Sequence, residues 1–119
     1  MTGILVLAHG SKREETDRIL QSILKMVRQK VSDTIVQAAY LQFSEKDLHW
    51  GVQSLVQQGV KHIKVVPFFI FDGVHVTEDI PNELLEIGKQ FPDVTLTMTS
   101  HLGDDERLAD IIVDRILGE

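Results

Sequence analysis

The sequence predicts an α/β fold, a single three-layer domain over residues 1–119 with a four-stranded, mainly parallel sheet flanked by helices. Two observations predict it. Four short apolar runs alternate with four longer segments whose apolar residues recur at helical spacing, and 119 residues suit one domain. A strand–helix series of this kind forms a parallel sheet with right-handed crossovers and helices on both faces.

The four predicted strands differ in their expected burial. Unbroken apolar runs suit strands that are covered on both faces, whereas alternation suits an edge strand. The first and third runs are continuous and apolar, and the last alternates Val, Leu and Met with Thr, so it is expected at an edge. The predicted strands cover residues 4–8, 34–43, 63–71 and 94–99.

The four predicted helices follow from apolar stripes. The first stripe is broken only by Lys30, near the helix end. The second helix follows Ser44 and Asp47, which resemble a capping box, and Gly59 is its expected stop. The third begins near Pro81, where proline is tolerated. The stripe residues are, in chain order, Ile19, Leu20, Ile23, Leu24, Met26, Val27 and Val31; Leu48, Val52, Leu55 and Val56; Leu84, Leu85 and Ile87; Leu108, Ile111, Ile112 and Ile116.

Composition excludes several classes of protein. The net charge of −6 argues against a general binder of nucleic acid or anionic membranes. The chain has no cysteine, so any metal site must use histidine, carboxylates or carbonyls. Residues 65–71 form the longest apolar run, which is too short to span a bilayer. Only three residues precede the first apolar run, so no signal peptide is expected and the cytoplasm is the predicted location.

Histidines cluster at the predicted functional edge of the sheet. Ligands of such folds bind outside the carboxyl ends of the strands. His9, His75 and His101 follow the first, third and fourth predicted strands, whereas His49 and His62 do not. Two neutral imidazoles suit Co²⁺, Ni²⁺, Fe²⁺ or Zn²⁺, so His9 and His75 are candidates for metal ligands or acid–base groups in a cleft. The alternatives are a strand-capping role for His9, a surface-loop role for His75 and an exposed turn for His101.

Charged residues near these histidines have two readings each. Lys12 and Arg13 open the first helix and either recognise carboxylates of a substrate or lie on a solvated face. Asp79 and Glu78 could orient His75 or bind metal, but capping of the third helix is the favoured reading for Asp79.

Two motifs resemble those of a known family. Leu7-Ala8-His9-Gly10-Ser11 and Gly73-Val74-His75-Val76-Thr77-Glu78-Asp79-Ile80-Pro81 are similar to motifs of the small CbiX-type sirohydrochlorin chelatases. Residues 66–71 resemble the family's strand before its second histidine, and residues 102–109 resemble its C-terminal segment. The resemblance covers nearly the whole chain, and the second motif is the more specific of the two.

The resemblance implies a lyase that inserts a divalent metal into sirohydrochlorin for cobalamin or related tetrapyrrole biosynthesis. Co²⁺ is favoured, with Ni²⁺ or Fe²⁺ as alternatives, and the metal is a substrate, so no permanently bound cofactor is expected. His9 and His75 become the pair that handles metal and protons. The residues expected to contact the tetrapyrrole are Ser11, Lys12, Arg13, Gln42, Phe71 and Gly73.

Gln42 departs from the family pattern, because many relatives carry glutamate at this place. Glutamine cannot act as a carboxylate base, so Glu45, Glu78 or the substrate's own carboxylates would have to take that role. The family also includes two-lobed enzymes about twice this length. Because a tetrapyrrole spans much of one face of so small a domain, a symmetric homodimer is the expected assembly.

Four other functions are weighed against this one. Histidine phosphatases place arginine immediately before the first-strand histidine, whereas this chain has Ala8. A receiver-like signalling domain would want acidic residues where His9 stands. Nucleotide binding is disfavoured because neither G-x-G-x-x-G nor G-x-x-x-x-G-K-[ST] occurs. A non-enzymatic carrier of metal or tetrapyrrole stays open as the alternative.

Overall fold

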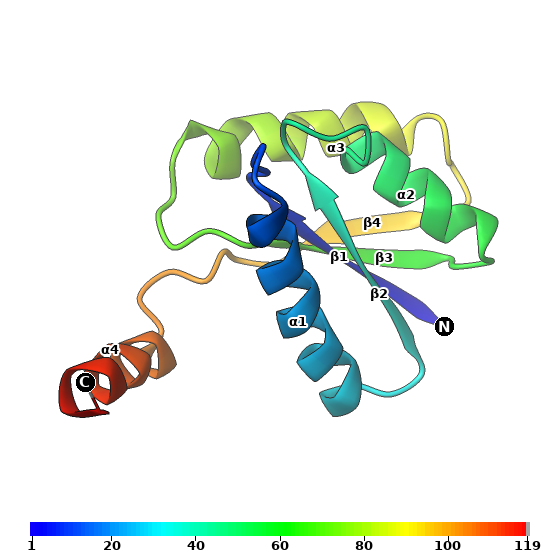
Figure 1. Ribbon diagram of the computed structural model, residues 1–119. Helices are drawn as coiled ribbons and strands as arrows, with labels where there is room; N and C mark the ends of the chain where they lie inside the picture. Colours follow the sequence, from blue (N-terminus) through cyan, green and yellow to red (C-terminus); the bar gives the residue numbers. More distant parts are fainter. Residues whose placement is uncertain (119) are drawn as a thin grey trace.

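The computed structural model describes residues 1–118, apart from the side chain of His75. Within this range the four strands are all parallel and lie in the order β2-β1-β3-β4, which confirms the predicted fold class (Figure 1). The elements are β1 (Thr2–Ala8), α1 (Glu14–Lys30), β2 (Thr34–Tyr40), α2 (Leu48–Gln57), β3 (His62–Pro67), a π-helix η1 (His75–Asp79), α3 (Ile80–Gly88), β4 (Thr95–Met98) and α4 (Glu106–Gly118).

Strands β2 and β3 end earlier than their apolar runs predicted. Residues 41–43 turn away from the sheet, and Phe43 has a φ of 61°, a left-handed conformation that no strand contains. Pro67 ends β3, although the N–H of Phe68 still donates to the carbonyl of Leu7 at 2.8 Å. The aromatic residues after Pro67 therefore form a loop, and the Phe71 side chain is 83% exposed.

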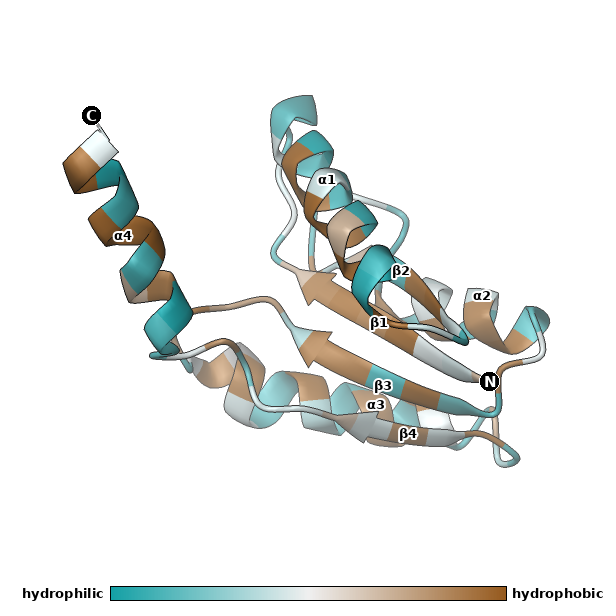
Figure 2. Ribbon diagram, turned by 90° about the horizontal axis from the view of Figure 1, so that it is seen from below, coloured by the Kyte–Doolittle hydropathy of each residue, from teal (hydrophilic) through white to brown (hydrophobic). Residues whose placement is uncertain are grey.

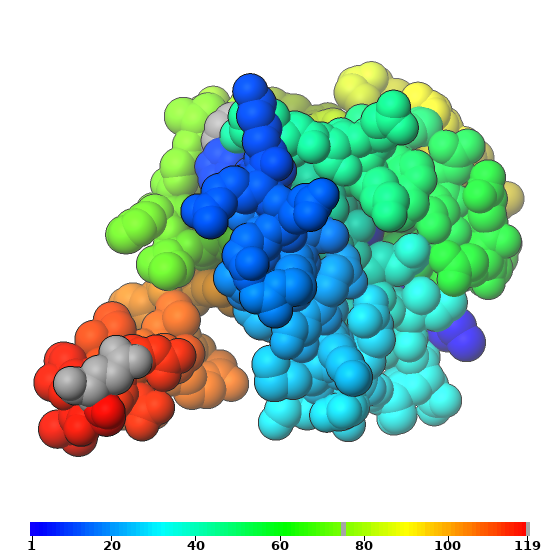
Figure 3. Space-filling model, in the orientation of Figure 1, coloured from blue at the N-terminus to red at the C-terminus, as the bar shows by residue number. Residues whose placement is uncertain are grey.

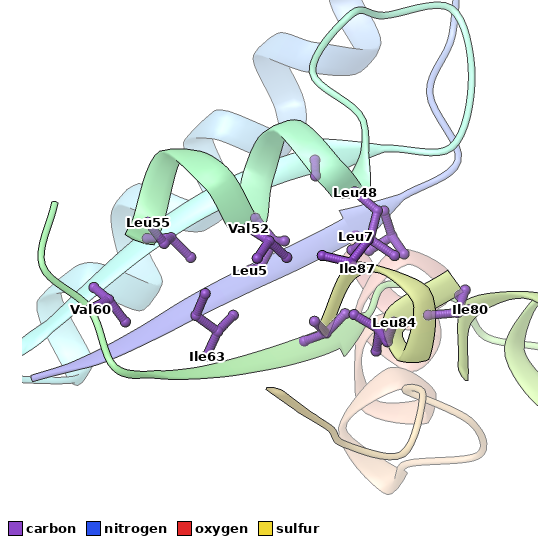
Figure 4. Close-up of a cluster of buried hydrophobic side chains, with 12 residues drawn as sticks. Leu5, Leu7, Leu48, Val52, Leu55, Val60, Ile63, Ile80, Leu84 and Ile87 are labelled. Atoms are coloured by element: carbon purple, nitrogen blue, oxygen red, sulfur yellow. The ribbon is translucent and has the colours of Figure 1, made fainter. Parts of the chain in front are cut away.

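Helices cover the two faces of the sheet and create two hydrophobic clusters. Leu5 and Leu7 of β1 point toward α2 and α3 and are fully buried (Figure 4). Val6 and Ala8 point to the opposite face, where Leu20 and Leu24 of α1 cover β1 and β2. Strand β1 is thus buried on both faces, as its unbroken apolar run predicts.

Local signals fix the ends of α2. The Asp47 carboxylate accepts from the Trp50 N–H at 2.9 Å and so caps the helix, whereas the Ser44 hydroxyl accepts from Lys46 N–H at 3.0 Å and takes no part in a capping box. The helix ends at Gln57, and Gly59, its predicted stop, follows the C-cap with a φ of 87°. The N–H groups of Gly59 and Val60 return to the carbonyls of Val56 and Leu55, the pattern of a Schellman motif.

Helix α3 begins at Ile80, which confirms the start predicted near Pro81. The π-helix over His75–Asp79, which the sequence did not predict, runs directly into α3. Asp79 has helical backbone angles, and in the described residues its side chain makes no cap hydrogen bond to α3. The capping role favoured for Asp79 is therefore wrong, because the chain is already helical when it reaches this residue.

Helix α4 stands away from the rest of the molecule. Figures 1 and 2 show it at the end of an extended connection from β4, and Figure 3 shows that it protrudes from the rest of the surface. None of its residues is buried. The radius of gyration is 15.1 Å, above the value of about 13–14 Å typical of a compact chain of this length. Among the described residues, no helix is long and apolar enough to cross a membrane.

Candidate functional site at the carboxyl edge of the sheet

His9 lies directly after β1, in the middle of the sheet edge. Gly10 follows it with a φ of 92°, which an L side chain rarely adopts, and a Cβ on Gly10 would lie 2.0 Å from the Gln42 carbonyl oxygen. This close approach lets the chain after β1 bond to the chain after β2. The Leu41 N–H donates to the Ala8 carbonyl at 3.0 Å, and the Gln42 N–H donates to the His9 carbonyl at 3.1 Å.

Two of the described residues contact the His9 ring. Its Nδ1 lies 3.5 Å from the Gln42 side-chain amide, and its ring meets the Phe69 ring edge to face at 5.4 Å between centroids. The Gln42 Nε2 is the amide atom that faces the ring, so it donates to Nδ1 and leaves the proton of the neutral imidazole on Nε2. Gln42 can therefore set the tautomer of His9 without carrying charge.

His75 reaches the same edge through the loop that follows β3, the strand paired with β1. The carbonyl of Gly73 anchors this region, accepting from the N–H groups of Val76 and Thr77 at 3.1 Å and from the Thr77 hydroxyl at 3.2 Å. The backbone of His75 begins the π-helix, a form found mostly at functional sites. Its side chain lies outside the described residues, so its predicted role stays a prediction.

His101 follows β4, the next strand along this edge. The N–H of the adjacent Leu102 donates to the Phe69 carbonyl at 3.0 Å, which ties the loop of His101 to the residue that contacts His9. The histidines at positions 9, 75 and 101 thus follow three neighbouring strands, as the predicted topology requires. His49 lies instead in α2, where its Nε2 is 2.8 Å from the Gln90 side-chain oxygen.

A pocket of about 470 Å³ opens between the start of α1 and the loop after β2. It is lined by four of the predicted substrate residues, namely Ser11, Lys12, Arg13 and Gln42. Phe71 and Gly73 are not among its lining residues. Ser11 accepts from the Arg13 N–H at 3.1 Å, so it also shapes the entry into α1.

Three further residues of this pocket were not predicted from the sequence. Phe43, Lys46 and Trp50 line it, with the Lys12 ammonium 5.3 Å from the Phe43 ring centre and the Lys46 ammonium 5.5 Å from the Trp50 ring centre. Their position in the chain could have indicated them, because the loop after β2 begins at the same edge of the sheet as His9. The pocket therefore combines aromatic faces with cations, a chemistry suited to a flat anionic ligand.

Tyr40 and Asp17 form the inner wall of this pocket. The Tyr40 hydroxyl donates to the Asp17 carboxylate. Burial first, and then the neighbouring carboxylate, raise the pKa of Tyr40 to about 12. The phenol therefore stays protonated at any physiological pH and holds the start of α1 against the end of β2.

Carboxylates of the described residues do not form a complete set of metal ligands. Among the described side chains, which omit His75, no three histidine or acidic residues group closely enough to hold a metal ion. Glu45 and Glu78, the two candidate substitutes for a carboxylate at position 42, are both exposed.

These features define a class of protein, a parallel α/β lobe with histidines and a basic aromatic pocket at the carboxyl edge of its sheet. The comparisons with known proteins give the family. The CbiX family model matches residues 3–118, so the chain belongs to the CbiX family.

Named relatives include chelatases of two lengths. The chain is 35% identical to the sirohydrochlorin cobaltochelatase of Methanosarcina acetivorans, covering 96% of this chain and 93% of the relative. It is also 35% identical to the chloroplastic sirohydrochlorin ferrochelatase of Arabidopsis thaliana, covering 96% of this chain but 51% of the relative. The chain therefore spans about half the length of the plant protein and nearly all of the archaeal one.

A solved structure of a longer relative matches the fold closely. The sirohydrochlorin chelatase SirB from Bacillus subtilis subspecies spizizenii, in complex with cobalt, has a TM-score of 0.90 and 25% identity. The match covers 98% of this chain and 50% of SirB. One copy of this chain thus corresponds to half of that protein.

Proposed function

We propose that this protein inserts Co²⁺ into sirohydrochlorin, with His9 and His75 handling the metal and the pyrrole protons. The observation that carries the proposal is the placement of His9 and the His75 backbone after the paired strands β1 and β3 in a CbiX-family chain. Cobalt is favoured because relatives of nearly this length, from Methanosarcina acetivorans and Methanosarcina barkeri, are named cobaltochelatases. Ni²⁺ and Fe²⁺ are the alternatives.

Chelation requires a metal that is partly dehydrated and a macrocycle that loses two protons. A neutral imidazole at His9 presents its Nε2 to the metal once the Gln42 amide turns its oxygen, in place of its nitrogen, toward the Nδ1 proton. As the metal moves to the pyrrole nitrogens, the imidazole released from it becomes available to accept a proton. His75 approaches from the neighbouring loop in the proposed mechanism, so that one imidazole can bind metal while the other takes a proton.

The tetrapyrrole is held by its flat faces and its carboxylates. Lys12, Arg13 and Lys46 supply cations around the pocket, and free N–H groups at the start of α1 add to the attraction for anions. The Phe43 and Trp50 rings offer apolar faces, and Phe69 walls the side next to His9. Phe71 and Gly73 are proposed to contact the substrate from the loop after β3, opposite the pocket.

The proposed assembly is a homodimer working in the cytoplasm. A single sheet edge leaves one face of a tetrapyrrole in water, and two copies would enclose it. The double length of the plant and Bacillus relatives supports two lobes per site. The absence of cysteine fits a reducing compartment.

The test is metal insertion by His9→Ala and His75→Ala variants, followed by the change in sirohydrochlorin absorbance. Each variant should lose about 100-fold or more of the rate, as is typical when a group acting on metal or proton is removed. His49→Ala is the matched control, because His49 bonds to Gln90 within the fold and is not among the lining residues of the pocket. Wild-type rates in both edge variants would contradict the assignment, and a single turnover with excess tetrapyrrole would indicate a carrier.

A further inference from the structure

Helix α1 has two flanks that face different hollows of the candidate site. Its polar flank carries Asp17 and Arg28 and lines the pocket of about 470 Å³ described above. Its other flank carries Thr16, Ile19 and Ile23, which lie at i, i+3 and i+7 and so share one face of the helix. This flank lines a smaller groove of about 230 Å³ between α1 and the chain that follows β3. One helix therefore presents a polar surface to one hollow and an apolar surface to the other.

His9 lines the smaller groove and is not among the lining residues of the larger pocket. Gly10 and Tyr40 line both hollows, so the two adjoin beside this histidine. In the proposed function, the metal passes between His9 and the pyrrole nitrogens at the centre of the macrocycle. The centre of the macrocycle must therefore lie at the groove, which leaves the rim for the pocket that holds Lys12.

The groove has the surface chemistry of an apolar binding site. Among the described residues that line it, none is a lysine, an arginine, an aspartate or a glutamate. Ile19 is 53% exposed although it belongs to the apolar stripe of α1, and Phe68 is half-buried on the side of β3. A complete pocket for a small molecule has a volume of about 300–1,000 Å³, so this groove suits one apolar portion of a larger ligand.

Sirohydrochlorin has one apolar feature that distinguishes it from other tetrapyrroles with the same rim. It carries methyl groups directly on its ring system, whereas uroporphyrin has the same acetate and propionate side chains and lacks these methyl groups. Cations attract the rim carboxylates of both compounds alike, so the pocket that holds Lys12 does not separate them. An apolar contact favours the methylated compound, because one such group in an apolar pocket changes affinity by about 10-fold or more.

We infer that the groove formed by Ile19, Ile23 and Phe68 binds the methyl-bearing part of sirohydrochlorin and selects it over unmethylated tetrapyrroles. The inference rests on the proposed function and adds residues that select the substrate to those that hold its carboxylates. His9 lines the same groove, so a substrate whose methyl groups fill the groove has its ring system beside the imidazole. Selection of the substrate thus belongs to the apolar flank of α1, and attraction of the rim belongs to the pocket.

The test compares the binding of sirohydrochlorin and uroporphyrin by quenching of Trp50 fluorescence, which is the only tryptophan signal of the chain. The wild-type chain should bind sirohydrochlorin about 10-fold more tightly or better. Ile19→Ala should remove most of this preference by weakening sirohydrochlorin binding, with little change for uroporphyrin. Ile19→Leu should keep the preference, because leucine retains an apolar side chain of the same size.

Two control variants separate selection from other effects. Met26→Ala removes another exposed apolar side chain of α1, which lines neither hollow, and it should leave the ratio of the two affinities unchanged. Lys12→Met should weaken both compounds by the same factor and so also leave the ratio unchanged. Because Ile19 is more than half exposed, Ile19→Ala should keep the circular-dichroism spectrum and the urea midpoint of the wild type.

The outcomes distinguish this inference from the proposed function. A wild type without the preference, or an Ile19→Ala variant that keeps it, overturns the inference. A changed mass of Ile19→Ala by light scattering with an unchanged ratio would assign the groove to an interface between copies, and this also overturns it. Binding with the expected preference but without metal insertion supports the groove and contradicts only the chelatase activity. Binding of neither compound contradicts both.

Discussion

The side-chain amide of Gln42 lies 3.5 Å from Nδ1 of His9, and the Gln42 N–H donates to the His9 carbonyl at 3.1 Å. Position 42 therefore fixes both the backbone and the ring of the edge histidine. An uncharged amide at this place orients an imidazole without stabilising its protonated form. A carboxylate would orient it and also attract a proton.

Gln42→Glu should shift the acid limb of the pH–rate profile for metal insertion to higher pH. The carboxylate favours the imidazolium form, so a higher pH is needed before His9 is neutral and can bind metal. Gln42→Leu should lower the rate without moving the limb in this direction, because it removes orientation and adds no charge. The measurement is the insertion rate between about pH 5 and 9, a range that includes the ordinary titration range of histidine. An unmoved limb in Gln42→Glu would separate His9 from the rate-limiting step.

Lys12→Met should weaken tetrapyrrole binding with little effect on the maximal rate. Loss of one charge-assisted contact costs about 1.5–3 kcal/mol, so KM should rise by about tenfold or more. The chain has one tryptophan, Trp50, which lines the same pocket, so quenching of its fluorescence reports binding directly. Lys89→Met is the control, because Lys89 pairs with Glu86 on the exposed side of α3 at 3.0 Å. Equal effects of the two variants would mean that Lys12 acts only through net charge.

The fold class and the edge of the site follow from the sequence because they depend on patterns that span many residues. The unbroken run that became β1 required burial on both faces, and a parallel sheet required His9 and His75 at one edge. Gly59 could be assigned as a helix stop because a positive φ after a helix favours glycine. These features are dictated by short-range chemistry repeated along the chain.

Other features depend on contacts between distant residues. Phe43 has a φ of 61° in the loop after β2, where its ring lies against the Lys12 ammonium, and its β-type sequence gives no sign of this. The amphipathic pattern of α4 predicts a helix with a covered face, but not that its own lobe leaves that face bare. The Phe43 backbone and the bare face of α4 both depend on tertiary contacts, which the periodicity of the sequence does not specify.

Tyr40 should titrate far above an ordinary tyrosine. Its pKa is raised to about 12, chiefly by burial and then by Asp17, and it is the sole tyrosine of the chain, so the ultraviolet titration of phenolate reports it alone. Because the folded pKa exceeds the unfolded value near 10, this group stabilises the fold fully below pH 10 and loses that contribution as pH rises toward 12. Urea unfolding should show this decline in the wild type.

Tyr40→Phe provides the control for that titration. It should lack the alkaline decline, and at neutral pH it should lower the free energy of unfolding by about 0.5–1.5 kcal/mol through loss of the bond to Asp17. A wild-type midpoint near 10 would show that the phenol is solvated and that the Asp17 contact does not persist in solution.

Gly10→Ala and Gly59→Ala should separate backbone strain from the packing of the site. Both glycines have positive φ values, 92° and 87°, but a Cβ on Gly59 meets nothing within 4 Å, whereas one on Gly10 would lie 2.0 Å from the Gln42 carbonyl oxygen. Gly59→Ala should therefore cost about 1–2 kcal/mol of unfolding free energy and leave insertion unchanged. Gly10→Ala should cost about 2–5 kcal/mol, because overlap with Gln42 is added to the strain. Gly10→Ala should also slow metal insertion, because the Gln42 carbonyl can move only if Gln42, which orients His9, shifts with it. Equal losses of stability and activity in the two variants would contradict this coupling.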